Sequence, residues 1–293
     1  MSVPNSSGNW APRLSAPPGS CDSHLHIYDP RFPASRPGSR LTRDATVSDY
    51  RLLQKRLGTS RAVVVQPAAY GFDNSVTVDA IAQLGIANTR GIAVVQPAIT
   101  DAELRELDRV GIRGVRFTQH DPATAVTTPD MIEPVAKRLA EIGWHAQLHM
   151  RGAQLVSIAE MVARLPCTIV IDHMGRLPQP DRDRAAPSKS IDHPAFDIVK
   201  RLLDSGRAWV KISGAYLDTR VGPPSYSDVR DVALALIRYA PDRCVWGSDW
   251  PHPTETEAKP DDAMLLDLLA DWSGNEETRR RILVDNPAAL YGF

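Results

Sequence analysis

Short apolar runs alternate with longer segments of amphipathic helical pattern along most of the chain. Eight apolar runs are present, at residues 21–29, 62–70, 90–97, 111–117, 144–150, 167–175, 208–216 and 244–251. Segments between them, such as 101–110 and 130–142, begin with an acidic residue, which the N-terminal end of a helix favours. Strands that alternate with helices in this way predict βα units and a parallel sheet.

The apolar runs have the composition of strands that are buried on both faces. VVVQ, IAVVQ and TIVI are almost continuously apolar, as parallel strands are. Eight such strands predict an α/β protein with a single (β/α)8 TIM barrel over residues 21–293, a fold that reaches about 250 residues as one domain. Residues 1–20, rich in Pro, Ser and Gly, predict a flexible N-terminal arm. Long loops at 31–47 and 177–193 are expected at the C-terminal face, where barrel active sites lie.

Composition narrows the classes of function. The chain is 43% hydrophobic and 24% charged, and its net charge of -1 gives no electrostatic basis for binding nucleic acid or membrane. No apolar stretch approaches the roughly 20 residues of a membrane span, and no apolar leader is present at the N-terminus. Cys21, Cys167 and Cys244 lack CxxC spacing and indicate buried free thiols. We therefore expect a cytoplasmic protein, as a monomer or small homo-oligomer.

Ionisable residues interrupt the apolar runs near their C-terminal ends. They are His24 and His26 in the first run, His149 in the fifth, His173 in the sixth and Asp249 in the eighth. The period of two along a strand turns His24 and His26 to the same side. Each buried polar group needs a partner, so packing alone is a poor explanation for five of them at matching positions. This set predicts an active site at the mouth of the barrel.

Several motifs carry a resemblance to a known family. DSHLHIYDP, the GVRF strand end, IDHMGR, VWGSDWPHP and DNPAALYGF resemble the amidohydrolase superfamily, in the branch that contains 2-pyrone-4,6-dicarboxylate lactonase and its relatives. The resemblance spans residues 21–293 and implies that water opens a lactone ring. It implies that Asp249 is the general base for water and that His173 assists it. His24 and His26 would then face the lactone carbonyl.

The fifth-strand histidine leaves two alternatives for a cofactor. The pyrone dicarboxylate lactonase resembles a metal-free branch without histidine at this position, whereas His149 matches the zinc-binding branches. His24, His26, His149 and Asp249 would offer one Zn2+ three neutral nitrogens and one carboxylate, with water as a further ligand. Alternatively, His149 hydrogen-bonds the substrate in a metal-free pocket. Both alternatives stay open from the sequence.

Three arginines predict an anionic substrate. Arg116, Arg151 and Arg176 follow strand ends, and guanidinium groups bind carboxylates or sulfonates bidentately. A surface salt bridge is the alternative, most of all for Arg151. Further candidate binding residues, for which loop packing is the alternative, are Tyr70, Asn74, Tyr216 and His252. We expect a pyrone dicarboxylate, a carboxy- or sulfo-muconolactone, or a sugar-acid lactone. Lys211 is expected to snorkel or to form an ion pair inside the barrel.

Three other functions compete with a lactone hydrolase. A zinc-dependent non-oxidative decarboxylase shares the HxH motif, the fifth-strand histidine and the last-strand aspartate, but the pairing of DHMGR with GSDWPHP favours the lactonase. A lactone isomerase is a closer alternative, against which the retained Asp249 argues. A catalytically inactive binding barrel would have lost part of the set, and none of its members is missing.

Overall fold

The strands follow one another around a parallel barrel in chain order. The computed structural model describes residues 2–35, 39, 41–121, 125–177 and 190–293. The sheet has eight strands in the order β1 to β8, and each neighbouring pair is parallel. Their bounds are β1 Cys21–Leu25, β2 Arg61–Val65, β3 Thr89–Ala93, β4 Ile112–Thr118, β5 His145–His149, β6 Thr168–Ile171, β7 Ala208–Ile212 and β8 Cys244–Trp246. The predicted (β/α)8 barrel is confirmed.

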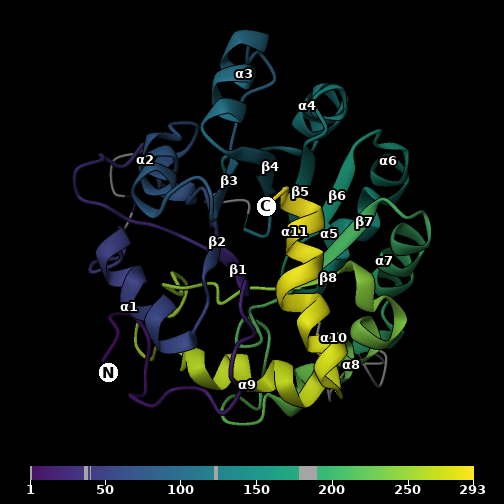
Figure 1. The fold of residues 1–293 in the computed structure, drawn as a ribbon. Coiled ribbons are helices and arrows are strands. Elements are labelled where there is room, and N and C mark those ends of the chain that lie inside the picture. The colour runs from purple at the N-terminus through teal and green to yellow at the C-terminus, as the bar shows by residue number, and fades with distance from the viewer. Residues whose placement is uncertain (1, 36–38, 40, 122–124, 178–189) are drawn as a thin grey trace.

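Helices surround the strands and form the outer layer (Figure 1). Their bounds are α1 Val47–Leu57, α2 Ser75–Leu84, α3 Asp101–Arg109, α4 Pro129–Glu141, α5 Gly152–Ser157, α6 Ala159–Arg164, α7 Pro194–Asp204, α8 Ser227–Tyr239, α9 Asp262–Ser273, α10 Glu276–Arg280 and α11 Asn286–Tyr291. The start of α3 shows how an acidic residue stabilises the N-terminal end of a helix. Thr100 and Glu103 form a capping box that satisfies free backbone N–H groups. The helices predicted at 101–110 and 130–142 are confirmed to within a residue.

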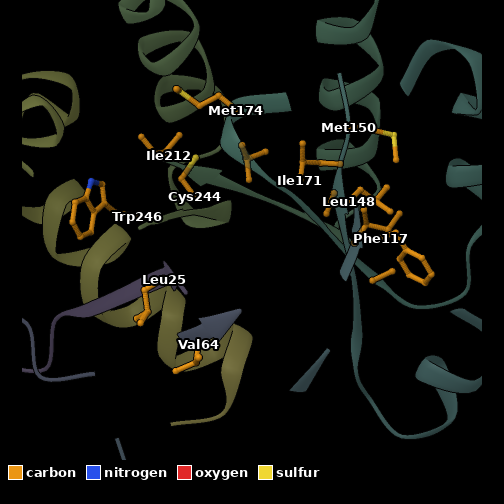
Figure 2. Close-up of a cluster of buried hydrophobic side chains, with 14 of the residues drawn as sticks. Leu25, Val64, Phe117, Leu148, Met150, Ile171, Met174, Ile212, Cys244 and Trp246 are labelled. Carbon is orange, nitrogen blue, oxygen red and sulfur yellow. The ribbon is translucent and has the colours of Figure 1, made fainter. Parts of the chain in front are cut away.

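Alternate residues of the strands enter two different cores. Val63 and Val65 of β2 point into the barrel, whereas Val64 packs outward toward the helices. Figure 2 shows the outer core, in which Phe117, Ile171 and other side chains from several strands lie in the layer between barrel and helices. Both faces of each strand are therefore buried, which explains why the runs are continuously apolar.

The C-terminal helix closes the N-terminal end of the barrel. In Figure 1, α11 lies across the strands and the chain ends near the centre of the view. Tyr291 is fully buried with inward-facing residues of β1, β2 and β3, and its ring lies 5.6 Å from the ring of His145, the first residue of β5. This end of the barrel is filled by side chains, so the opposite end is the one available to a ligand.

The first and last strands meet at a seam that hydrogen bonds close. The buried carboxylate of Asp22 in β1 accepts the backbone N–H of Ser248 at 2.9 Å and its hydroxyl at 2.6 Å. Beyond the strand ends, Asp249 donates its N–H to the carbonyl of His24, and His26 donates to the carbonyl of Trp250. The seam thus joins the segment of the HxH motif to the segment of the last-strand aspartate.

The predicted strands are too long at their C-terminal ends. β1 ends at Leu25 rather than at residue 29, and β8 ends at Trp246 rather than at residue 251. Polar side chains and turns replace the ladder there, because the chain leaves the barrel to form the loops of the C-terminal face. The part of the loop at 31–47 that the structure describes precedes α1, whereas most of the loop predicted at 177–193 lies outside the described residues.

The N-terminal segment differs from the expected loose arm. Val3 is buried, and the carbonyl of Pro4 accepts the indole N–H of Trp250 at 2.8 Å. The side chain of Asn5 donates to the carbonyls of Arg43 and Asp44. A buried indole needs an acceptor, so its partner holds this segment against the barrel. Among the described helices, none has the length and apolar character that a membrane crossing requires.

Candidate active site

Three side chains from the seam converge on one point. The Nε2 atoms of His24 and His26 lie 3.3 Å apart, and Asp249 Oδ1 lies 3.5 Å from the first and 3.4 Å from the second. All three residues are buried. The expectation that His24 and His26 face the same side holds, although the register of β1 shifts between Asp22 and Leu25.

The backbone around this point is shaped to bring the side chains together. A Cβ at Gly247 would lie 2.6 Å from the Cβ of His24 and 2.7 Å from its backbone nitrogen, so only glycine fits here. Asp249 has a φ of 64° and His173 a φ of 50°, both in the left-handed region that is costly for these residues. Such strain concentrates at functional sites, where the surrounding structure holds it.

The second oxygen of Asp249 has partners of its own. Tyr216 donates its hydroxyl to Oδ2 at 2.7 Å, and His173 Nε2 lies 3.9 Å from the same oxygen. The Nδ1 atom of His173 contacts the hydroxyl of Ser213 at 2.9 Å. Four of the five residues expected at the mouth of the barrel, together with Tyr216, therefore form one cluster.

Burial sets the protonation states in this cluster. It lowers the pKa of His173 to about 4 and that of His24 well below its ordinary value, so both rings are neutral near pH 7. Burial alone would raise the pKa of Asp249. Its interactions with His173 and His26 outweigh this effect and hold that pKa well below the usual range. Asp249 is therefore an ionised acceptor beside neutral imidazoles.

The donor set fits a metal ion. The point equidistant from His24 Nε2, His26 Nε2 and Asp249 Oδ1 is about 2 Å from each atom, which is the usual zinc–ligand distance. His26 contacts the carbonyl of Val65 through Nδ1 at 2.8 Å, which leaves its Nε2 lone pair facing this point. Ligand atoms of His24, His173 and Asp249 also lie within 4.8 Å of one another.

His149, expected as a fourth ligand, faces two arginines, and its ligand atom also lies within 4.8 Å of ligand atoms of Asp172 and His173. Its Nδ1 lies 2.9 Å from Nη2 of Arg116, and its Nε2 lies 3.4 Å from Nη1 of Arg176. Burial and the charge of Arg116 hold its pKa well below the ordinary value. A neutral imidazole has one lone pair, and the shorter contact assigns it to Nδ1. Nε2 then carries the proton, so its 3.4 Å contact with Arg176 Nη1 is not a hydrogen bond, because a guanidinium offers no acceptor.

The two arginines are buried beside the cluster, and their contacts with the described residues leave some of their N–H donors unused. Arg116 donates from Nε to Asp172 at 2.9 Å, and Arg176 binds Asp218 through Nε at 2.6 Å and Nη2 at 2.8 Å. Each guanidinium carries five N–H donors, so donors remain for an anion. His149 lies between the two guanidinium groups. The remaining N–H donors could bind an anion, and we call these three residues the candidate anion subsite.

Four predicted binding residues are occupied by local contacts. The hydroxyl of Tyr70 bonds to the backbone of Asp29, and Asn74 bonds to the backbone of Val94 through both side-chain ends. Arg151 is exposed and donates to the carbonyl of His120. His252 lies behind Tyr216, where its Nε2 faces the carboxylate of Asp262 at 3.2 Å. The four side chains thus make these contacts outside the cluster, apart from the ring of His252, which packs against Tyr216.

Asp172 is a site residue that the sequence reasoning missed. Its buried carboxylate contacts Arg116, Gln147 and His24, and it immediately precedes His173 in the DHMGR motif, a signal that could have identified it. Lys211, fully buried, has its Nζ 3.8 Å from Asp172 Oδ1, which agrees with the expected ion pair. Burial lowers the pKa of Lys211 to about 8, so the ammonium form predominates at pH 7.

Comparison with known proteins shows the family of this chain. The model of the amidohydrolase family matches residues 21–293. The chain belongs to the amidohydrolase family. This amidohydrolase is 36% identical to a 4-sulfomuconolactone hydrolase of Hydrogenophaga intermedia over 96% of its own length and 91% of the relative's. It is 34% identical to a 2-pyrone-4,6-dicarboxylate hydrolase of Comamonas testosteroni, over 96% and 92%. A D-galactarolactone isomerase of Agrobacterium fabrum is 31% identical, over 96% and 94%.

Proposed function

We propose that this amidohydrolase is a lactonase that uses water to open the ring of an anionic lactone. The observation that carries the proposal is the position of Asp249, an ionised carboxylate that faces His24 and His26 beside two buried arginines. Relatives named for a sulfomuconolactone and a pyrone dicarboxylate support a substrate with a sulfonate or carboxylate group.

Each residue of the site has its own role in hydrolysis. Arg116 and Arg176 bind the anionic group of the substrate through their remaining N–H donors, and His149 lies between them. Asp249 accepts a proton from the attacking water as the water oxygen bonds to the lactone carbonyl carbon. When the ring C–O bond breaks, that proton returns to the departing oxygen. His173, a neutral ring beside Asp249, donates or accepts a hydrogen bond during this exchange.

We propose a single Zn2+ as the cofactor, held by His24, His26 and Asp249. His173 lies close to these ligands. Bound zinc would polarise the lactone carbonyl and lower the pKa of the attacking water. His149 belongs to the substrate subsite in this proposal, not to the ligand set. Metal analysis of protein purified without chelator should find one zinc per chain, whereas full activity after exhaustive EDTA treatment would contradict the proposal.

Lactone hydrolysis is tested by product analysis. A panel of carboxylated and sulfonated lactones is scored for acid release near pH 8, and active substrates are repeated in H2(18)O. A hydrolase incorporates one 18O into the carboxylate product. Asp249→Asn should reduce turnover by several hundred-fold or more, while Arg151→Lys, a change at an exposed arginine, should not. Turnover that survives Asp249→Asn would refute the assigned base.

A lactone isomerase is the second candidate, because one relative carries that name. An isomerase would return a rearranged lactone that contains no solvent oxygen, so the same 18O experiment separates the two. Release of CO2 would identify a decarboxylase instead. A cytoplasmic location, a state of monomer or small homo-oligomer, and a domain division at residue 20 remain predictions.

A further inference from the structure

A donor and an acceptor compete for the inner nitrogen of His24. Nδ1 lies 3.3 Å from Nζ of Lys211 and 3.4 Å from Oδ1 of Asp172. The three side chains are fully buried, so water does not replace either partner. An imidazole nitrogen accepts a hydrogen bond or donates one, and it cannot do both. Its choice at Nδ1 decides whether Nε2, the atom that faces Asp249, carries a proton.

If Lys211 donates to His24, the proton of the ring lies on Nε2. That proton has an acceptor, because His26 Nε2 lies 3.3 Å away with its lone pair free. Lys211 also keeps its bond of 2.8 Å to the carbonyl of Ser23. In this arrangement Asp172 Oδ1 has no hydrogen-bond partner among the residues that the structure describes. The cluster needs no cation in this state.

If His24 instead donates to Asp172, the buried oxygen gains a partner. Three acceptors then face one another, the Nε2 atoms of His24 and His26 and Asp249 Oδ1, at separations of 3.3 to 3.5 Å. Three lone pairs at this distance repel unless a cation lies among them. This state therefore belongs with an occupied metal site.

We propose that Lys211 and Asp172 make the tautomer of His24 a switch that sets how readily this site takes a divalent metal. Lys211 stabilises the metal-free form and Asp172 the metal-bound form. The inference rests on the proposed metal site and not on the identity of the substrate. Asp172 also accepts a hydrogen bond from Nε of Arg116 through its other oxygen, which links the switch to the anion subsite.

The tautomer is measured directly by long-range 1H–15N correlation spectra of protein labelled with 15N-histidine. The His24 signals are assigned by comparison with a His24→Gln variant. Metal-free protein should show His24 protonated on Nε2, and titration with Zn2+ should move the proton to Nδ1. An Nδ1-protonated ring in the metal-free protein would overturn the proposal.

Variants on either side of Nδ1 should have opposite effects on zinc affinity, measured by chelator competition. Lys211→Met should raise the affinity about tenfold and give an Nδ1-protonated His24 without metal. Asp172→Asn should lower the affinity by about 10–100-fold, the usual effect of losing a partner of a metal-binding histidine. Gln147→Met is the control. It removes a hydrogen bond to Asp172 Oδ2 but leaves the contacts of His24 Nδ1 in place, so the affinity should change less than about threefold.

Two outcomes distinguish this proposal from the proposed function. A Lys211→Met protein that binds zinc more tightly but keeps its metal-free His24 protonated on Nε2 would reduce the role of Lys211 to charge alone and refute the switch. Failure of the wild-type protein to hydrolyse any lactone would refute the lactonase and leave the tautomer and affinity measurements untouched. If Lys211→Met does not fold, the zinc titration of the wild-type protein still decides.

Discussion

Replacement of Arg116 by lysine tests the anion subsite most sharply. Arg116 is 5% exposed, and its guanidinium contacts Asp172 at 2.9 Å through Nε and His149 at 2.9 Å through Nη2. Lysine keeps the positive charge but offers a single ammonium, which cannot reach both partners and the substrate in the same geometry. The change thus removes directional donors while it leaves Asp172 with a counter-charge.

The magnitude follows from the bonds that are lost. A hydrogen bond to a charged group contributes about 1.5–3 kcal/mol, and loss of one such bond to the substrate anion should raise KM by about 10–100-fold. Asp172 keeps a cation beside it, so the variant avoids the penalty of about 3–5 kcal/mol for an unpaired buried charge. We expect the free energy of unfolding to fall by only about 1 kcal/mol.

The assay compares two lactones that differ in one group. Steady-state kinetics are measured for a carboxylated lactone and for its neutral methyl ester, with wild-type protein, Arg116→Lys and the exposed-arginine control Arg151→Lys. Arg116→Lys should reduce kcat/KM for the carboxylated lactone at least tenfold more than for the ester. Equal losses for both lactones would show that Arg116 supports the fold of the site and does not bind the anion.

Three further changes test other parts of the structure. Tyr216→Phe removes the donor 2.7 Å from Asp249 Oδ2, and steady-state kinetics should show kcat about tenfold lower with KM nearly unchanged. Gly247→Ala places a Cβ against His24, so thermal unfolding should show a loss of about 1–3 kcal/mol and kinetics a loss of activity of at least 100-fold. Burial lowers the pKa of His145 to about 3, below the 6.5 of the unfolded chain. Its contribution to stability is therefore intact above pH 6.5 and falls by about 1.4 kcal/mol per unit as the pH drops toward 3. Urea unfolding measures how much the free energy of unfolding falls between pH 7 and pH 4.5. This fall should be about 2–3 kcal/mol smaller for His145→Gln than for wild type, and equal falls would refute the assignment.

The barrel and the centre of the site could be predicted from the sequence because their signals are local. A parallel strand buried on both faces is an apolar run, as in the segment around Val63 and Val64. Polar residues at the ends of such runs must lie at the same end of the barrel. His24, His26, His173 and Asp249 lie at such positions, and the structure brings them together.

The partners of individual atoms could not be predicted, because they come from distant strands. His149 has the residue type of a zinc ligand, but its ring orientation depends on Arg116 and Arg176. Tyr70 and Asn74 were expected to bind substrate because they follow strand ends, yet nearby backbone groups satisfy them. Residue type and position along a strand therefore locate a site more accurately than they assign its ligands.

The candidate active site should form late in folding, because it lies across the seam between β1 and β8. Asp22 and Ser248, which close it, are 226 residues apart in the chain, and His24, His26 and Asp249 are joined across the same seam. Contacts of such high sequence separation form slowly, since the intervening chain must already be ordered. We also expect the seam to open locally at a lower free energy than the whole barrel. Catalytic activity should therefore be lost, and regained, at milder denaturant concentrations than the secondary structure.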